Sequence, residues 1–558
     1  MMKVMKGLAL TALLMLGAQS AFAGPVPAGT MLDDHIYLFL VTDGEPTSFD
    51  VSRATDSAAF EIMGNCLQGL VMNNVNATHD GIEQVGGDAE SWTVSEDGTV
   101  WTFKLKEDAV WADGKPVTAH DYVYSFRRTT DPKTGSPSSW YMTPIKNAEK
   151  VMDGEVAVEE LGIRAIDDKT LEITLEEPNA YFKEMLSNIA YFPQRQDKVE
   201  EWGDKYGTEA KYFIGNGPFE LAEWVHNSKI VMKKSDTFND KANVYPEKID
   251  IIQLHDSQAV RNAMFAGQID LCGAESPEDI DRYTKEGFVV SSIPGVRLKS
   301  TIYNTQDKIF GNAKVRKAFA LATDRETLVE LLWGGLADAQ KGYIPAGINV
   351  EEQGNFRELS GDLYGKLMDD LKAEGKTPKD LLIEGMQELG LGDDPSTLDV
   401  TMLLCGTSTW DTQMADYFID AFANELGVKL KVDKYEFGIA LDKMGKGEYQ
   451  LAYLGWGADF NDPFPYLEMY HSDFDYNFSF WKNEKYDDLI EAARKEFDAH
   501  KRNEMLMQAE KLLISDEMVV QAMVSTRVEL AMRPEIKNYP LFPFNTEGYR
   551  YVYTDGRK

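Results

Sequence analysis

The sequence predicts an α/β protein that is divided into more than one domain. Short apolar stretches bounded by turn residues alternate with long amphipathic stretches, which favours strands packed under helices. At 558 residues the chain is too long for a single hydrophobic core. No repeat of solenoid length and no low-complexity linker interrupts it. We therefore expect two or three compact domains joined by short crossings, which we place near residues 300–304 and 519–526.

The first residues are typical of a cleaved secretory signal. Lys3 and Lys6 precede an apolar run over residues 7–17, and Ala21-Phe22-Ala23 supplies the small residues that a signal peptidase needs. An N-terminal membrane anchor is the alternative, and the shortness of the run disfavours it. Because no cysteine follows the expected cleavage point, we expect residues 1–23 to be removed and the product to be a soluble periplasmic protein rather than a lipoprotein.

Charge and composition exclude several classes of ligand. The formal net charge of −35 argues against nucleic acid and against anionic membrane surfaces, because both are negatively charged. The seven histidines show no spacing typical of a metal site, so neither a metal nor another cofactor is predicted. The three distant cysteines leave room for one disulfide, but their odd number favours mostly buried, reduced thiols: Cys66, Cys272 and Cys405.

The first third of the chain combines one long periodic stretch with several short ones. Residues 35–41 have the composition of a strand, and residues 56–72 have helical periodicity. A hairpin is predicted over residues 88–105, with Asp97-Gly98 in its turn. The alternation of its second strand places three large apolar residues on one face: Trp101, Phe103 and Leu105.

The remaining elements alternate between helices and strands. A helix over residues 119–128 should be capped by Thr118, with Asp121 completing a capping box. Further helices are expected at 311–332 with a restart near Asp324, and at 362–373, 378–389, 410–426, 483–499 and 501–513. Strands are expected at 398–404, 428–432 and 451–454.

The stretch over residues 451–463 is the strongest candidate for a functional site. A short apolar strand leads into glycines around Trp456, then into Asp459 among small and aromatic residues, and ends at Pro463. A carboxylate among apolar neighbours is costly unless it has a partner, and the nearest basic residue on the N-terminal side is Lys446. Either Asp459 is simply exposed, or it receives a cation from outside the chain; our hypothesis is that it receives the free ammonium of a peptide.

A series of motifs extends over nearly the whole chain after the signal. They are Ala89-Glu90-Ser91-Trp92, Trp111-Ala112-Asp113-Gly114-Lys115-Pro116, Asp121-Tyr122-Val123-Tyr124-Ser125, Gly215-Asn216-Gly217-Pro218-Phe219, Ala263-Met264-Phe265-Ala266-Gly267, Val315-Arg316-Lys317-Ala318 and Gly455-Trp456-Gly457-Ala458-Asp459-Phe460-Asn461-Asp462-Pro463. In type and order these motifs resemble those of the peptide-binding proteins of ABC importers, in the extracytoplasmic solute-binding family that contains the oligopeptide- and dipeptide-binding proteins.

The resemblance implies a fold and a function. The fold is a two-lobed α/β periplasmic binding protein of class II, with an additional subdomain on the first lobe. It assigns lobe I to 24–71, 183–299 and 526–558, the subdomain to 72–182, and lobe II to 300–525. The implied function is to capture peptides in a cleft between the lobes and to deliver them, as a monomer, to an ABC transporter permease. The chain is not expected to be an enzyme.

The resemblance also implies roles for individual residues. Asp459 lies where family members hold the amino terminus of the peptide, and further ligand contacts are expected from Trp456, Gly457, Ala458, Phe460 and Trp410. Asp411 and Tyr453 occupy positions where some members present basic groups to the peptide carboxylate. Neither balances that charge here, which favours longer or variable ligands. Gly457 stands at the family's disulfide position, so that this cross-link is absent, and Asp462 is expected to be a solvated turn residue.

Two alternatives stay open at this point. Some relatives bind metal chelates, haem or oligosaccharides, so the ligand class is not fixed by the family. A secreted hydrolase is the alternative from another class, although the chain has no G-x-S-x-G motif and no phosphate-binding loop. Ser408 is interpreted as a helix cap rather than as a nucleophile.

Overall fold

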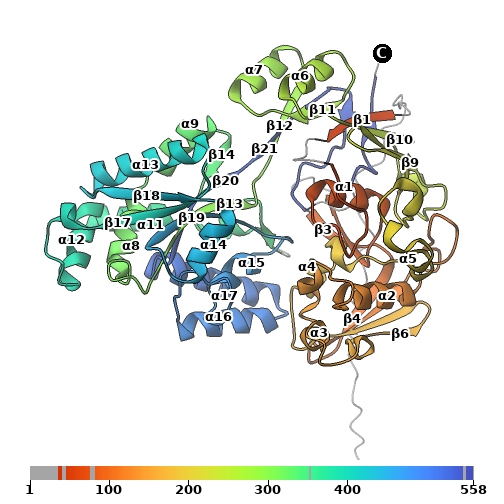
Figure 1. Cartoon of the computed structure of the whole chain (residues 1–558), viewed down its shortest axis with the longest axis horizontal. Helices are drawn as coiled ribbons and strands as arrows, with labels where there is room; N and C mark the ends of the chain where they lie inside the picture. Colours follow the sequence, from red (N-terminus) through yellow and green to blue (C-terminus); the bar gives the residue numbers. More distant parts are fainter. Residues whose placement is uncertain (1–34, 41–44, 76–81, 351–352, 545–547, 557–558) are drawn as a thin grey trace, which may run out of the picture.

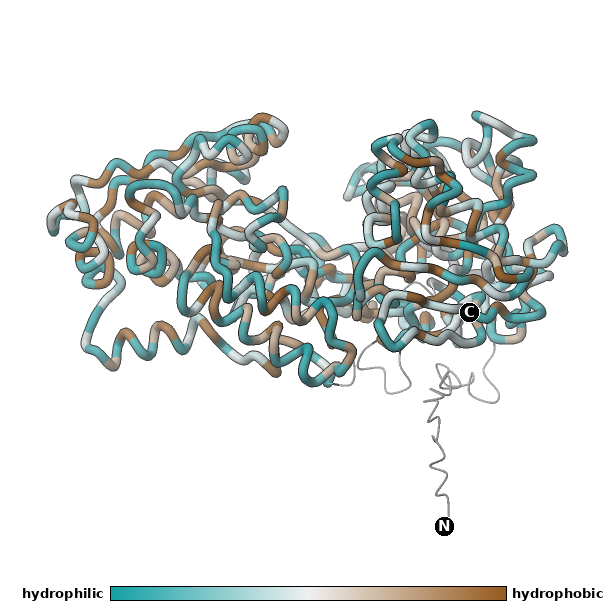
Figure 2. The backbone as a smooth tube through the Cα atoms, turned by 90° about the horizontal axis from the view of Figure 1, so that it is seen from below, coloured by the Kyte–Doolittle hydropathy of each residue, from teal (hydrophilic) through white to brown (hydrophobic). Residues whose placement is uncertain are grey.

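The computed structural model describes residues 35–40, 45–75, 82–350, 353–544 and 548–556, and the predicted signal at 1–23 lies outside these ranges. The chain forms two lobes that lie side by side in both views (Figures 1 and 2). The first lobe contains the red to yellow segments of Figure 1, and the second contains the green to blue segments. The C-terminal end returns to the first lobe, where the Tyr549 backbone N–H donates to Asn65 at 2.9 Å.

The first lobe is built on a four-stranded sheet. Its order is β1 (His35–Leu40), β10 (Lys248–Gln253), β9 (Lys229–Lys234) and β8 (Phe219–Val225), with β1 parallel to β10. The strand predicted at 35–41 is thus confirmed. The periodic stretch at 56–72 instead divides into α1 (Ser57–Cys66) and β2 (Val71–Val75), because β2 leaves the helix to pair with β3 (Ile82–Gly86).

An additional subdomain on the first lobe has a sheet of its own. Its strands are ordered β4 (Ala89–Val94), β5 (Val100–Leu105), β7 (Thr170–Thr174) and β6 (Ile163–Asp167). The predicted hairpin is confirmed, and its alternating apolar residues Trp101, Phe103 and Leu105 are buried. Helix α2 (Ala119–Thr130) begins with the expected capping box, in which the Asp121 carboxylate accepts from the Thr118 N–H at 2.8 Å.

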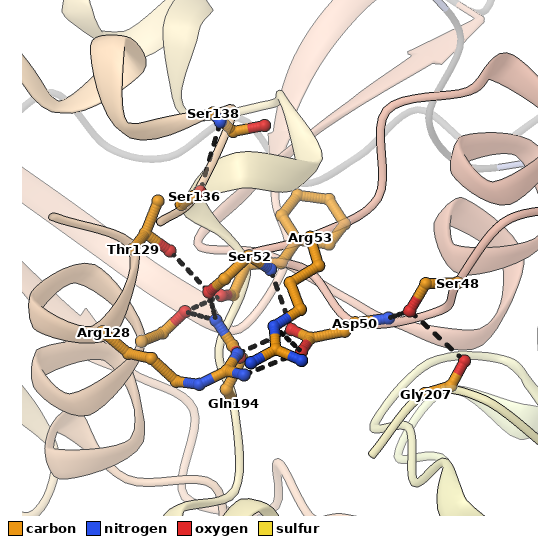
Figure 3. A network of polar contacts seen from close by, with 12 residues as sticks. Ser48, Asp50, Ser52, Arg53, Arg128, Thr129, Ser136, Ser138, Gln194 and Gly207 are labelled. Atoms are coloured by element: carbon orange, nitrogen blue, oxygen red, sulfur yellow. Dashed lines mark hydrogen bonds and ion pairs between the residues drawn. The ribbon is translucent and has the colours of Figure 1, made fainter. Parts of the chain in front are cut away.

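A buried polar network fastens the subdomain to the first lobe (Figure 3). The carboxylate of Asp50 accepts two hydrogen bonds from the guanidinium of Arg128 in α2, at 2.6 and 2.7 Å. Gln194 donates to Ser52, whose hydroxyl is 2.9 Å from that of Thr129. Because a buried charge is costly unless it is paired, these contacts hold the two parts together in one arrangement.

Shorter helices complete this region: α3 (Ala148–Met152), α4 (Phe182–Met185) and α5 (Gln196–Trp202).

The second lobe surrounds a six-stranded mixed sheet. The strand order is β14 (Ala337–Ala339), β20 (Val520–Thr526), β13 (Arg297–Tyr303), β19 (Leu451–Gly457), β17 (Val400–Cys405) and β18 (Leu430–Tyr435). Strands β17, β18 and β19 are parallel, whereas β13 is antiparallel to β19. A small hairpin is formed by β15 (Asn349–Val350) with β16 (Gly354–Asn355). In the C-terminal segment, which returns to the first lobe, β22 (Ile536–Lys537) pairs with β23 (Tyr553–Thr554) in a separate two-stranded antiparallel sheet.

The helices predicted for the second lobe are confirmed, with small shifts at their ends. They are α8 (Ala313–Leu321), α9 (Arg325–Trp333), α11 (Leu363–Ala373), α12 (Pro378–Glu388), α13 (Thr409–Glu425), α16 (Glu484–Lys495) and α17 (Ala499–Glu510). Asp324 caps α9 where a restart was expected. Three further helices were not predicted: α10 (Phe356–Ser360), α14 (Phe437–Gly445) and α15 (Phe464–Leu467).

Two crossings connect the lobes, and both differ from the expected positions. Strands β11 (Leu271–Gly273), β21 (Val528–Met532) and β12 (Val289–Ile293) form a separate sheet beside α6 (Ser257–Phe265) and α7 (Pro277–Lys285). The chain therefore changes sheets at residues 294–296 and at Arg527. The segments at 300–304 and 519–526 belong largely to β13 and β20, and their backbones are committed to ladders inside the second lobe.

None of the helices in these described ranges combines the length and apolar character of a membrane span. Over the same ranges, no group of three or more His, Cys, Asp or Glu side chains is arranged to hold a metal ion.

Candidate functional site

The candidate site lies on the loop that follows β19. Strand β19 runs between β13 and β17 in the middle of the second lobe's sheet, and its parallel neighbour β17 ends at the same edge. In open α/β sheets, ligands bind outside the carboxyl ends of the parallel strands. Residues 457–463, here named the ligand loop, leave β19 at this edge and lead into α15, which faces α4 of the first lobe (Figure 1).

The backbone of the ligand loop is held by contacts within the second lobe. The Ala458 N–H donates to the hydroxyl of Tyr466 at 3.3 Å, and the Trp456 indole N–H donates to the Pro465 carbonyl at 3.3 Å. The Asn461 side chain accepts from the Asn349 N–H at 3.0 Å. These bonds fix the turn from which the side chain of Asp459 projects.

Asp459 is an exposed carboxylate in a partly dehydrated position. Its pKa is raised because surrounding protein atoms displace water from the charge, while Tyr141 and, more weakly, Arg297 counteract that increase. Tyr141 belongs to the 3₁₀ turn Ser139–Met142 of the first lobe, so groups from both lobes meet at this carboxylate. No salt bridge to Asp459 is formed by any described residue, which leaves its charge available to an external cation.

Asp462 is not the solvated turn residue that the sequence predicted. Its side chain is only 5% exposed and forms a bidentate ion pair with Arg502 of α17, with N–O distances of 2.7 and 2.8 Å. One of its oxygens also accepts from the Phe464 N–H at 2.8 Å. The prediction was wrong because its partner lies in a helix that the loop sequence gives no reason to expect nearby. Asp462 therefore anchors the loop, whereas Asp459 is presented by it.

The predicted aromatic contacts lie in different surroundings. Trp456 is half-buried at the site, beside Asp459 and the loop that carries it. Phe460 is 7% exposed and stacks on Tyr181 of the first lobe at a centroid separation of 5.6 Å. Trp410 is half-buried at the start of α13 and packs edge-on against Trp333 at 5.2 Å. The structure thus brings Trp456, Gly457, Ala458 and Asp459 together, and it uses the rings of Phe460 and Trp410 in packing.

Asp411 and Tyr453 are engaged in the architecture of the second lobe. The Asp411 carboxylate accepts from the N–H and the hydroxyl of Ser408, at 2.8 and 2.6 Å, which confirms Ser408 as a helix cap. Tyr453 is 5% exposed and packs edge-on against Phe418. Within the described ranges its hydroxyl has no hydrogen-bond partner. Neither side chain presents a positive charge.

Two basic residues on β13 were missed by the sequence reasoning. In the antiparallel register Arg297 is opposite Gly457 and Lys299 is opposite Gly455. A side-chain carbon on Gly455 would lie 3.1 Å from the Lys299 ammonium, and one on Gly457 would lie 3.0 Å from the Arg297 stem, so both glycines leave room for these chains to cross β19. No described carboxylate forms a salt bridge with either one. The sequence signal that could have found them is a pair of basic residues, Arg297 and Lys299, at alternate positions of a strand whose other residues are buried.

Comparison with known proteins identifies the family. The family model described as bacterial extracellular solute-binding proteins, family 5 middle, matches residues 83–478. The dipeptide-binding protein DppE of Bacillus subtilis is 30% identical over 493 residues, which cover 88% of this chain and 87% of DppE.

Solved structures agree with this match. The murein tripeptide binding protein MppA in its unliganded open form superposes with a TM-score of 0.79 at 27% identity, covering 95% of this chain and 99% of MppA. OppA of Listeria monocytogenes bound to peptide gives a TM-score of 0.67 at 26% identity, covering 94% of this chain and 99% of that structure. On the match to the family model and the similarity along nearly the full length, this chain belongs to the bacterial extracellular solute-binding proteins of family 5.

Proposed function

We propose that the chain captures peptides between its two lobes and that Asp459 receives their terminal ammonium. The observation that carries this proposal is the contrast within the ligand loop. Its backbone and the neighbouring Asp462 are fixed by bonds inside the protein, yet no described residue forms a salt bridge with Asp459. A carboxylate in a partly dehydrated site gains more from an ammonium than a surface carboxylate does. A relative with a bound peptide supports the same ligand class.

The two lobes contribute different parts of the binding interaction. Asp459 supplies charge, and Tyr141, which already interacts with this carboxylate, supplies a hydroxyl from the first lobe, so both groups can contact the same ammonium. An extended peptide also pairs its backbone with strand edges, which gives affinity that is independent of sequence. Trp456 and Ala458 border this position and are the proposed neighbours of the first side chain.

Lys299 and Arg297 are the proposed partners of acidic groups on the peptide. Because Asp411 is acidic and Tyr453 is buried, they do not serve this purpose, whereas the two cations of β13 cross toward the carboxyl end of β19. An unpaired cation in a partly enclosed position favours an anionic ligand group. A peptide with a free carboxylate should therefore bind the wild type more tightly than the same peptide with a carboxyamide in its place. In the Lys299→Met variant this difference in affinity should disappear.

We also propose delivery to an ABC transporter permease, which membership of the family supports. We propose that the chain acts as a monomer in the periplasm after removal of residues 1–23, that it is not a lipoprotein, and that it catalyses no reaction. The proposed division keeps the subdomain at 72–182 and moves the two lobe boundaries to the crossings, with lobe I at 24–71, 183–296 and 527–558 and lobe II at 297–526. Lobe closure about the crossings at 294–296 and Arg527 would bury the ligand. Small-angle scattering should then give a smaller radius of gyration with peptide than without.

The ligand class is tested first with a mixture. A tryptic digest of casein at millimolar concentration should raise the melting temperature, because a ligand that binds only the folded chain stabilises it. Mass spectrometry of the protein after washing should recover a bound peptide. An unchanged melting temperature together with recovery of a non-peptide solute, such as a metal chelate, haem or an oligosaccharide, would replace the proposal.

The role of Asp459 is tested by calorimetry with the recovered peptide and its N-acetylated form. Asp459→Asn keeps the volume and should weaken binding of the free amine by about 30-fold to several thousand-fold, from a loss of about 2–5 kcal/mol. The acetylated peptide should bind the wild type equally poorly, and the two changes should not add. Asp393→Asn is the matched control, since Asp393 is an exposed carboxylate between α12 and the turn Pro395–Thr397. Wild-type affinity in Asp459→Asn would refute the assignment.

A further inference from the structure

Tyr181 brings a first-lobe ring into contact with the ligand loop of the second lobe. The ring stacks on Phe460 with centroids 5.6 Å apart and planes inclined by 10°, and on Phe464 of α15 at 4.4 Å and 28°. The guanidinium of Arg502 in α17 lies over the same ring, 5.5 Å from its centroid. One aromatic side chain that follows β7 of the subdomain is therefore enclosed by three side chains of the opposite lobe.

The second-lobe side of this contact is fixed by its own buried bonds. Arg502, which lies over Tyr181, forms the bidentate ion pair with Asp462 of the ligand loop. Its Nε also donates to the Ala493 carbonyl at 3.1 Å. The ring of Tyr181 thus rests on groups that are themselves held in place within the second lobe.

The segment just before Tyr181 is itself held against the second lobe. The Ala180 N–H donates to the Arg494 carbonyl at 2.8 Å, and Lys495 pairs with Glu177 at 3.0 Å. The backbone immediately before Tyr181 therefore keeps a defined position against the C-terminal end of α16. This contact lies outside the two crossings, so it is an additional connection between the lobes.

Adjacent residues of the ligand loop face different environments. Phe460 is packed against Tyr181, whereas the carboxylate of Asp459 is exposed and interacts with Tyr141. Because the two residues share a peptide unit, the position of the Phe460 ring determines how Asp459 is presented. Tyr141 and Tyr181 both belong to the first lobe, and they contact the loop at consecutive residues.

We propose that Tyr181 is a positioning residue for the ammonium site and that it acts through Phe460. This inference rests on the proposed role of Asp459. The first lobe then sets the geometry of the anchor in the second lobe, before any ligand arrives. Among the described residues the Tyr181 hydroxyl makes no hydrogen bond, so the ring is the required group and phenylalanine should replace it.

The experiment compares free-amine and N-acetylated forms of the peptide recovered from the casein digest, using calorimetry on the full mature chain. Displacing the Asp459 carboxylate should weaken its pairing with the ammonium without abolishing it, so the loss should fall in or below the lower part of the range expected for Asp459→Asn. Tyr181→Leu should therefore weaken binding of the free-amine peptide by roughly 10- to 100-fold and leave that of the acetylated peptide within about 3-fold. Tyr181→Phe should keep the wild-type ratio. Phe460→Leu should reproduce the loss, and its combination with Tyr181→Leu should add little.

Tyr206 supplies a matched control for general damage to the first lobe. It is also a buried tyrosine with an arginine over its ring, Arg128 at 5.7 Å, and it does not contact the ligand loop. Tyr206→Leu should keep the wild-type ratio between the affinities for the free-amine and the N-acetylated peptide. The inference is overturned if Tyr181→Leu retains that ratio, if Tyr181→Phe loses it, or if Tyr206→Leu loses it equally. A wild type that does not distinguish the two peptides would remove the Asp459 anchor, and with it this role of Tyr181.

Discussion

Replacing Asp462 by Asn should destabilise the second lobe by about 3–5 kcal/mol, because breaking a buried ion pair leaves an uncompensated charge. Arg502 is 8% exposed, and its guanidinium binds both oxygens of Asp462, at 2.7 and 2.8 Å. Asparagine preserves the volume and one acceptor, so the loss is electrostatic rather than a cavity effect. Since whole domains are stabilised by about 5–15 kcal/mol, a change of this size is a large fraction of the total.

Urea unfolding followed by circular dichroism measures this effect. A chain of this length often unfolds in more than one transition, so midpoints are compared transition by transition. Asp393→Asn should stay within about 0.5 kcal/mol of the wild type, as surface substitutions usually do. Adding Arg502→Met to Asp462→Asn should recover part of the stability, because it removes the unpaired charge. If Asp462→Asn unfolds with the wild-type midpoint, the ion pair makes no net contribution to the stability of the lobe and the reasoning is refuted.

Three further outcomes are expected. Peptide affinity should fall on acidification, because only the ionised form of Asp459 pairs with an ammonium. Since dehydration raises the pKa of Asp459, the fall should begin at a higher pH than it would for an aspartate with its ordinary pKa. An affinity that calorimetry finds constant across this pH range would contradict the prediction. Burial raises the pKa of Asp88 to about 7, so the folded protein holds a proton that the unfolded chain releases at lower pH. The stabilisation from this proton is complete below about pH 4 and is lost as the pH rises through about 7, and the free energy of unfolding falls by up to about 1.4 kcal/mol per pH unit in this window. Asp88→Asn should remove that slope from urea unfolding, and an unchanged slope would exclude Asp88 as its source. Thiol labelling of the denatured protein should find three free thiols, since none is paired in the structure, and a lower number would contradict reduced cysteines: Cys66, Cys272 and Cys405.

Local chemistry explains what the sequence determined. The hairpin around Asp97-Gly98 and the capping box of Thr118 with Asp121 depend on neighbours within a few positions, so their patterns predict them directly. The strand at 451–454 was predicted in the same way, because an apolar run between turn residues must be buried. The same pattern places Asp459 in the loop that leaves the sheet at the end of this strand, but it does not decide whether the carboxylate is exposed.

Tertiary structure decided which charges have partners. Asp459 and Asp462 are three positions apart in one loop, and no local pattern distinguishes them. Arg502 reaches Asp462 because α17 packs against the loop, whereas Asp459 projects toward Tyr141. The same holds for Lys299, whose path over β19 depends on the antiparallel register that puts Gly455 opposite it. Solvation and pairing of a charge depend on the groups that surround it in space, and those groups come from segments that the sequence around it does not specify.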